Sequence, residues 1–385
     1  MNSDDGAVAV GDIGILKTSC VSYDRFNPYE SKPVVKDELQ SVKCAVEKDS
    51  VIVSRMNTPE RVGACGYVST DFPNLFLPDR LWKLKFQDNV DAYFVYMMLV
   101  SSVYKEKITS MASGTSGSMY NIPKETFLNL QLVVPVQTSE QRKIGQVLRQ
   151  LNDLITLHQR KYDKLQVLKK AMLEKMFPKN GSSVPEIRFK GFTDAWEQRK
   201  LFEMCGTFEY GLNAAAKEFD GKNKYIRITD IDDASREFLL SDLSSPDICL
   251  DGMSKYLLSS GDIVFARTGA SVGKTYIYRE NDGIVYFAGF LIRAKVNQDN
   301  DAEFVFQSTL SPSYEKYIRI TSQRSGQPGV NAQEYGEYDL FAPSKEEQQR
   351  IGHFLRGIDS LITLHQRELE KLQNIKKSML EKMFV

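Results

Sequence analysis

The chain has 385 residues and is 42% hydrophobic, which is enough for two or three domains with their own cores. Lys and Arg balance Asp and Glu at 50 each, so nucleic-acid binding would require local basic clusters or partners that bring charge. The N-terminus does not resemble a signal peptide, no apolar run is long enough to span a membrane, and the five cysteines form no C-x-x-C pair, so we expect a cytoplasmic protein with reduced thiols.

The first third of the chain, to about residue 135, has a mixed pattern. Residues 51–54 and 81–86 are predicted to be strands, and Asn89 is predicted to cap an amphipathic helix that ends near Tyr104. A long helix follows over residues 139–177. The next segment, residues 178–185, has the composition of a linker.

The second half repeats this order. Its mixed segment covers about residues 186–343, and a second long helix follows over residues 346–384. Strands are predicted near residues 224–229, 262–266, 275–278 and 284–295.

The two long helices are copies of one another. Residues 140–177 and 347–384 share 24 identities in 38 positions, at an offset of 207. Each copy starts with a potential capping box, formed by Thr138 with Gln141 and by Ser344 with Glu347. So close a repeat indicates tandem duplication.

Apolar residues in both copies recur with the spacing of a coiled-coil seam. A helix of about 57 Å cannot bury such a stripe alone, so we predict that the copies pack antiparallel as a spacer. His158 and His365 occupy equivalent seam positions, where a polar residue more often fixes register than binds metal. The predicted seam consists of Ile144, Leu148, Leu151, Ile155, His158, Leu165, Ile351, Leu355, Ile358, Ile362, His365 and Leu372.

The mixed segments also repeat, but weakly. Residues 15–18 match residues 226–229 at an offset of 211, and Arg55 matches Arg267 at an offset of 212. We therefore predict tandem α/β (α+β) domains, each followed by a long helix. The expected boundaries are 1–138 and 139–178 for the first domain and helix, 179–185 for the linker, and 186–343 and 344–385 for the second pair.

Over nearly its whole length the chain resembles the specificity subunit of type I restriction–modification systems. The resemblance rests on the order domain–helix–domain–helix, on residues 187–201 and 261–274, and on the Pro-Ser-Lys-Glu-Glu-Gln-Gln-Arg-Ile motif that ends at Ile351. It implies a non-enzymatic chain with two target-recognition domains, each of which reads half of a split site in double-stranded DNA. It also implies docking of methyltransferase subunits, two being expected, and of nuclease–translocase subunits, without a membrane.

Residues 269–275 resemble a phosphate-binding Walker loop, and this leaves a nucleotide enzyme as one alternative. The glycines are separated by three residues instead of four, and Thr275 is predicted to open a strand instead of a helix. A coiled-coil scaffold without a DNA role is the other alternative. No His/Cys cluster has zinc spacing, so we expect neither metal nor cofactor.

Two polar loops of the second domain, residues 267–274 and 324–331, carry residue types suited to phosphates and base edges. Residues 113–121 are the loose first-domain counterpart of the second loop. The residues expected at the DNA are Lys17, Arg55, Lys217, Lys224, Arg227, Arg267, Thr268, Ser271, Lys274, Arg324 and Gln327.

The first domain has no counterpart of the segment that opens the second. About forty residues, from Ile187, precede Ile226, but only fourteen precede Ile15, its match in the first domain. We therefore predict that residues 1–14 are poorly packed, that apolar surface and a strand edge are exposed, and that the first domain reads its half-site more weakly.

Overall fold

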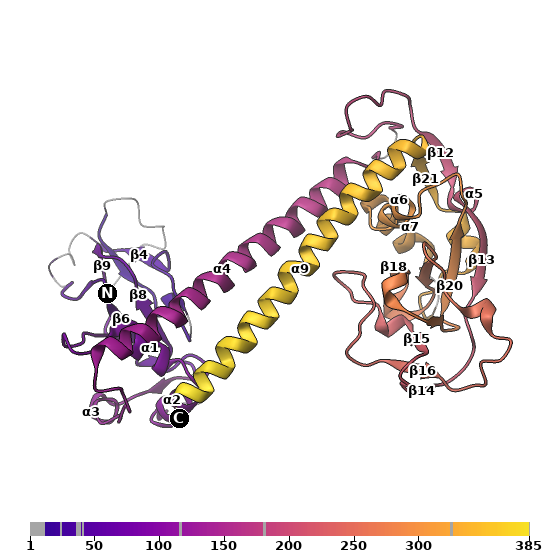
Figure 1. Ribbon diagram of the computed structural model, residues 1–385. Helices are drawn as coiled ribbons and strands as arrows, with labels where there is room; N and C mark the ends of the chain where they lie inside the picture. Colours follow the sequence, from indigo (N-terminus) through magenta and orange to yellow (C-terminus); the bar gives the residue numbers. More distant parts are fainter. Residues whose placement is uncertain are drawn as a thin grey trace. The chain divides into compact units, whose positions relative to one another are not determined.

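The computed structural model describes residues 12–23, 25–35, 40, 42–114, 118–179, 182–323 and 326–384. The chain divides into two compact units, Met1–His158 with Glu368–Val385 (unit 1) and Gln159–Arg367 (unit 2). Two long helices, α4 (Thr138–Lys175) and α9 (Lys345–Met383), each contribute one part to each unit (Figure 1). Their bounds lie within two residues of the predicted ones.

Unit 1 contains short strands in small sheets, with helices packed against them. The largest sheet has the order β4-β1-β9-β5, with β1 and β9 parallel, and a second sheet has the order β10-β6-β8. The strands are β1 (Gly14–Leu16), β2 (Val21–Ser22), β3 (Arg25–Phe26), β4 (Ser31–Pro33), β5 (Ala45–Val46), β6 (Ser50–Ser54), β7 (Met56–Asn57), β8 (Cys65–Val68), β9 (Phe72–Phe76), β10 (Leu81–Leu84) and β11 (Tyr120–Asn121), and the helices are α1 (Ala92–Leu99), α2 (Ser102–Ser110) and α3 (Lys124–Leu128).

Unit 2 is built around the sheet β13-β20-β17-β18. The fully buried Phe265, Ile292 and Phe304 lie in its core, together with seam residues of α9. The strands are β12 (Glu197–Lys200), β13 (Cys205–Tyr210), β14 (Ala216–Glu218), β15 (Lys224–Ile226), β16 (Ser244–Pro246), β17 (Ile263–Ala266), β18 (Thr275–Ile277), β19 (Val285–Phe287), β20 (Leu291–Val296) and β21 (Asp339–Ala342), and the helices are α5 (Leu201–Met204), α6 (Ala302–Ser308), α7 (Pro312–Thr321) and α8 (Ala332–Gly336).

Some predicted elements are wrong in their bounds. The helix expected from Asn89 to Tyr104 is two helices, because Asp91 caps α1 and Ser101 interrupts the run by capping α2. The strand expected over residues 284–295 is split into β19 and β20, because the chain turns between them.

The start of each long helix is fixed to its unit by a glutamine. Gln141 accepts a hydrogen bond from Asp91 N at 2.9 Å and donates to Pro135 O at 2.8 Å. Gln348, its equivalent 207 positions later, makes the same pair of bonds in unit 2. The partners there are Asp301 N (3.0 Å) and Pro343 O (2.9 Å).

The side chains expected to complete the two capping boxes make other contacts. Gln141 is used in the anchoring contact just described. Glu347 accepts two hydrogen bonds from Arg188, a residue that precedes it by more than 150 positions. Gln141 and Glu347, the second residues of the two predicted capping boxes, therefore connect the starts of α4 and α9 to the globular parts of their units.

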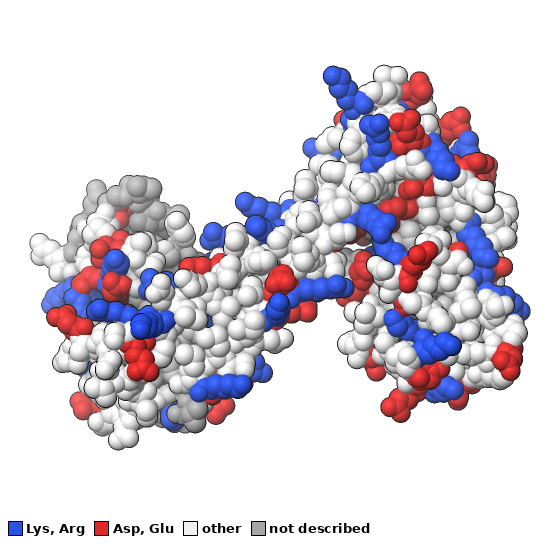
Figure 2. All heavy atoms as spheres, viewed as in Figure 1, with Lys and Arg blue, Asp and Glu red and all other residues white. Residues whose placement is uncertain are grey.

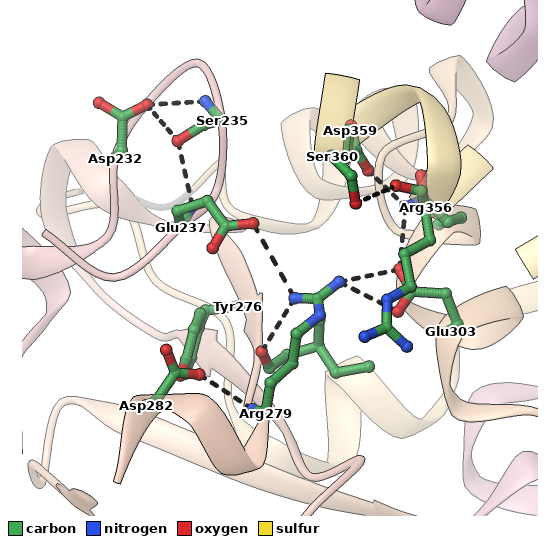
Figure 3. Close-up of polar contacts among 12 residues, drawn as sticks. Asp232, Ser235, Glu237, Tyr276, Arg279, Asp282, Glu303, Arg356, Asp359 and Ser360 are labelled. Carbon is green, nitrogen blue, oxygen red and sulfur yellow. Dashed lines mark hydrogen bonds and ion pairs between the residues drawn. The ribbon is translucent and has the colours of Figure 1, made fainter. Parts of the chain in front are cut away.

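In unit 2 a polar network joins the globular part to α9. Figure 3 shows Arg279 between Glu237 and Glu303, with Asp359 of α9 close to Glu303. Gln307 donates to both Glu303 (3.1 Å) and Asp359 (2.8 Å) and so links α6 to α9. Burial raises the pKa of Glu303, while the nearby Arg279 opposes that rise.

Two further expectations concern the N-terminal segment and the cysteines. Residues 1–11 of the segment predicted to be poorly packed lie outside the described residues, whereas Gly14 is buried in β1, so for that residue the prediction is wrong.

All five cysteines are free thiols, and burial raises the pKa of Cys65 to about 12. None of the helices among the described residues has the length and hydrophobicity to span a bilayer.

Candidate nucleic-acid interface

In unit 2 the two loops singled out from the sequence lie against each other. Thr268 pairs with Gly329 in a β-bridge, and Gly269 N donates to Pro328 O at 3.0 Å. Residues 267–274 and 326–331 therefore form one surface, which we call the paired-loop face. The predicted Arg324 lies outside the described residues.

Arg267, the first residue of loop 267–274, is held in place by a main-chain hydrogen bond and by two aromatic rings. Its N donates to Phe290 O at 3.1 Å, and its guanidinium carbon lies 5.2 Å from the Tyr210 ring centroid and 5.8 Å from that of Phe290. The Nε atom is buried and has no hydrogen-bond partner among the described residues. The residues Tyr210 and Phe290 are 45% and 56% exposed. A fixed arginine beside exposed rings suits contact with a base edge and a thymine methyl group.

The main-chain hydrogen bonds that hold Arg267, which we call its frame, recur around Arg55 in unit 1. Arg55 N donates to Arg80 O at 3.1 Å, and Ile122 N donates to Arg55 O at 2.9 Å, as Val330 N donates to Arg267 O in unit 2. Arg55 and Arg267 therefore occupy equivalent places, and Arg80 stands where unit 2 has an aromatic residue. The Arg55 side chain is turned to the main chain, because its Nε donates to the carbonyl oxygen of the residue before Arg80 at 2.7 Å.

An equivalent glycine closes the turn that follows each frame arginine. Gly63 and Gly273 have φ values of +81° and +83°. An added Cβ would lie 2.5 Å from the Cγ2 atom of Ile108 in unit 1 and of Ile318 in unit 2. Both the backbone conformation and the lack of space exclude a side chain at these two positions.

A basic hollow of about 740 Å³ lies in unit 1. Lys17, which was predicted at the DNA, lines it and is exposed. Lys32, Lys43 and Arg80 also line it, with Asp79 as the one carboxylate among its described lining residues. The sequence analysis missed these three cations, because strand pairing that no local pattern predicts brings them together.

Other predicted cations of unit 2 are satisfied within the fold. Lys274 pairs with Asp233 at 2.5 Å, and its side chain is only 15% exposed. Lys224 donates to a main-chain oxygen, that of Asp282, at 2.6 Å. Arg227 forms a double hydrogen bond with the carboxylate three residues later, which raises the pKa of the guanidinium. These contacts hold the three side chains within the fold, and their role at the DNA stays a prediction.

The last predicted residues differ in exposure. Lys217 is exposed on β14, Thr268 and Ser271 are half-buried, and Gln327 is exposed on the paired-loop face. Basic and acidic side chains are interspersed on the side of the molecule shown in Figure 2. Sequence reasoning missed Phe290, and the signal that could have identified it is an aromatic residue in a short turn between two strands.

The geometry does not support a nucleotide site at residues 269–275. Thr275 begins strand β18, is fully buried, and shares a hydrogen bond with Thr309 at 2.7 Å. A Walker loop needs a helix N-terminus at this point. In the part of the chain that the structure describes, no group of His, Cys, Asp and Glu side chains is arranged to hold a metal ion.

The chain therefore contains two copies of one arginine-centred frame, and these define a duplicated recognition module. The family model named type I restriction modification DNA specificity domain matches residues 7–167 and again residues 193–374. The chain belongs to this family and carries the domain twice. The prediction of a non-catalytic specificity subunit of a type I restriction–modification system is thereby confirmed.

Relatives and solved structures agree with this assignment. The chain is similar to the type I restriction enzyme MjaVIII specificity subunit of Methanocaldococcus jannaschii, with 24% identity over 75% of this chain and 68% of the relative. It is also similar to the EcoEI specificity subunit of Escherichia coli, with 23% identity over 32% of this chain and 21% of that one. The S subunit from M. genitalium shares the fold, with a TM-score of 0.59, 18% identity, and coverage of 100% of this chain and 97% of that chain.

Proposed function

We propose that the chain reads a bipartite site in double-stranded DNA, one half through each unit. The observation that carries this proposal is the repeated frame, which holds Arg55 and Arg267 at equivalent places. In unit 2 the paired-loop face, with Phe290 beside it, reads base edges. In unit 1 Arg80 stands at the place of Phe290 and reads a base edge, while the lysines of the basic hollow contact phosphates.

We further propose that α4 and α9 form an antiparallel coiled-coil spacer between the half-sites. Contacts inside each unit support this arrangement. In unit 2, Leu165 in the second half of α4 packs against a cluster that contains Leu355 and Ile358 in the first half of α9. In unit 1, Leu148 in the first half of α4 shares a cluster with Leu380 near the end of α9.

The burial of the predicted seam gives further support. Every predicted seam residue is buried or half-buried, including His158 and His365. Lys169 of α4 forms an ion pair with Asp359 of α9, and both side chains are largely buried. The near identity of the two helices would give two methyltransferase subunits equivalent docking surfaces, and nuclease–translocase subunits would join that assembly.

Reconstitution with methyltransferase subunits tests the DNA role against the scaffold alternative. Affinity for DNA that contains the site should fall steeply with added salt, because bound phosphates release counterions. Native mass spectrometry should find two methyltransferase subunits for each chain. Reconstituted complexes that retain no DNA at any salt concentration would leave the chain as a scaffold.

A further inference from the structure

In unit 2 the segment before α9 is a strand with a paired neighbour, whereas the equivalent segment of unit 1 has no paired strand among the described residues. In unit 2, β12 pairs antiparallel with β21, with Arg199 opposite Leu340. Residues 131–134 are the equivalents of β21, at an offset of 208. Among the described residues, no strand pairs with residues 131–134, and within this segment Val133 N donates to Tyr104 Oη at 3.2 Å. This uncovered segment of unit 1 lies just before α4 in the chain.

The segment that leads into β12 is anchored at two points in unit 2. Arg188 binds Glu347 through two hydrogen bonds, with Nε to Oε1 at 2.7 Å and Nη2 to Oε2 at 2.8 Å. Trp196 is only 3% exposed and packs edge-on against Phe304, with 5.8 Å between the ring centroids. Residues 184–201 thus cover this side of unit 2 as one anchored segment.

Unit 1 keeps the receiving residues without such a cover. Glu140, the equivalent of Glu347, is exposed. The exposed apolar side chains that precede it are Leu128 (63%), Val133 (76%), Val134 (36%) and Val136 (97%). An apolar patch beside an extended segment that has no paired strand is the arrangement that accepts an added strand.

We propose that this face of unit 1, formed by residues 128–136 with Glu140, binds a segment with the chemistry of residues 184–201. The segment would be supplied by a partner protein and would add antiparallel to residues 131–134. It would place an arginine on Glu140 and apolar side chains over the exposed valines. This inference does not rest on DNA recognition.

A partner protein suits this face better than a second copy of the chain. The copy's own segment is already held by the pairing of β12 with β21 and by the burial of Trp196. Releasing it would uncover the core of unit 2, which contains Trp196 and Phe304. A partner whose segment is not committed elsewhere has no such cost.

The test uses the full chain and a fluorescently labelled peptide of residues 184–201. Fluorescence anisotropy should show saturable binding of one peptide per chain, and hydrogen exchange should slow at residues 131–134. Val133→Glu with Val136→Glu should weaken binding at least about tenfold, because charges are placed on the apolar patch. Val167→Glu is the matched control and should leave binding unchanged, since Val167 is 69% exposed and belongs to unit 2 instead of this face.

A charge exchange tests the anchoring contact separately. The peptide with Arg188→Glu should bind the unaltered chain at least about tenfold more weakly and should regain affinity for the chain with Glu140→Arg. Absence of saturable binding, or binding that survives Val133→Glu with Val136→Glu, would overturn the proposal. A chain dimer that these two substitutions dissociate would also overturn it, because the face would then belong to a second copy.

Discussion

The two units join their globular parts to their helices with different chemistry at equivalent positions. In unit 1, Asn152 of α4 donates to Tyr93 Oη at 2.8 Å, and the Arg149 guanidinium lies 4.3 Å from the Tyr93 ring centroid. In unit 2, the equivalents of Tyr93 and Asn152 are Glu303 and Asp359, and a glutamine of α6 links them. The junction between the globular part and the helix is thus aromatic in unit 1 and ionic in unit 2.

What stays the same between the units is the backbone anchoring. The contacts of Gln141, at 2.9 and 2.8 Å, recur for Gln348 at 3.0 and 2.9 Å. The frames of Arg55 and Arg267 share their main-chain hydrogen bonds. Side chains at the junctions and beside the frames differ. Hydrogen bonds to the main chain therefore fix the duplicated fold, while the chemistry of the surfaces remains free to change.

Substitution in the seam should have the largest effect. Leu151 and its equivalent Ile358 are 8% and 5% exposed, so Leu151→Asp or Ile358→Asp buries a carboxylate and should cost at least about 3 kcal/mol of unfolding free energy. Leu154→Asp and Leu361→Asp are matched controls, because these residues are 45% and 46% exposed. Denaturant unfolding measures all four, and equal losses for seam and control variants would refute the packing.

The second-largest effect is expected at Glu347, which anchors residues 184–201 through Arg188, and it should differ between the two units. Glu347→Ala leaves Arg188 largely buried without its carboxylate and should cost about 3 kcal/mol in unit 2. Glu140→Ala, at the equivalent exposed position of unit 1, should change stability by less than about 0.5 kcal/mol. Thermal unfolding of the two variants gives the comparison, and a similar loss for both would contradict it.

Phe290 and Arg80, which lie beside the two frames, should each contribute about 1–3 kcal/mol of discrimination between bases for each base contact. Phe290→Ala should relax one position in one half-site, and Arg80→Ala should act only on the other half-site. Binding selection with randomised DNA and the reconstituted complex measures both effects. Uniform loss of affinity, without a change in the preferred bases, would make Phe290 a packing residue.

The smallest expected effect is a pH dependence confined to the ionic junction. Burial raises the pKa of Glu303 above its ordinary value of 4.5, so protonated Glu303 contributes stability that is fully present below that value and is lost as the pH rises through the folded pKa. Glu303→Gln removes this titration, and the stability of that variant relative to the unaltered chain should rise as the pH is raised from 4.5 through the folded pKa. Thermal unfolding across this range measures the trend. Tyr93→Phe, at the equivalent position of unit 1, should show none, and a matching trend there would contradict the assignment to Glu303.

Much of this architecture follows from local sequence pattern. The long helices are predicted because a duplicated heptad pattern leaves few alternatives, and both loops of the paired-loop face were singled out for one role. The cluster of Lys32, Lys43 and Arg80 could not be predicted, because the parallel pairing of β1 with β9 that gathers it is long-range. The ion pair of Lys274 with Asp233 could not be predicted either, because Asp233 comes from a loop about forty residues earlier.

We propose above all that each unit reads its own half of the DNA site. Mapping of methylated adenines in a host that carries this chain tests it most directly, with Arg55→Ala and Arg267→Ala introduced singly and together. We expect Arg267→Ala to relax one half-site, Arg55→Ala to alter only the other, and the double variant to combine the two changes. Equal loss of methylation specificity at both half-sites from either single substitution would contradict it.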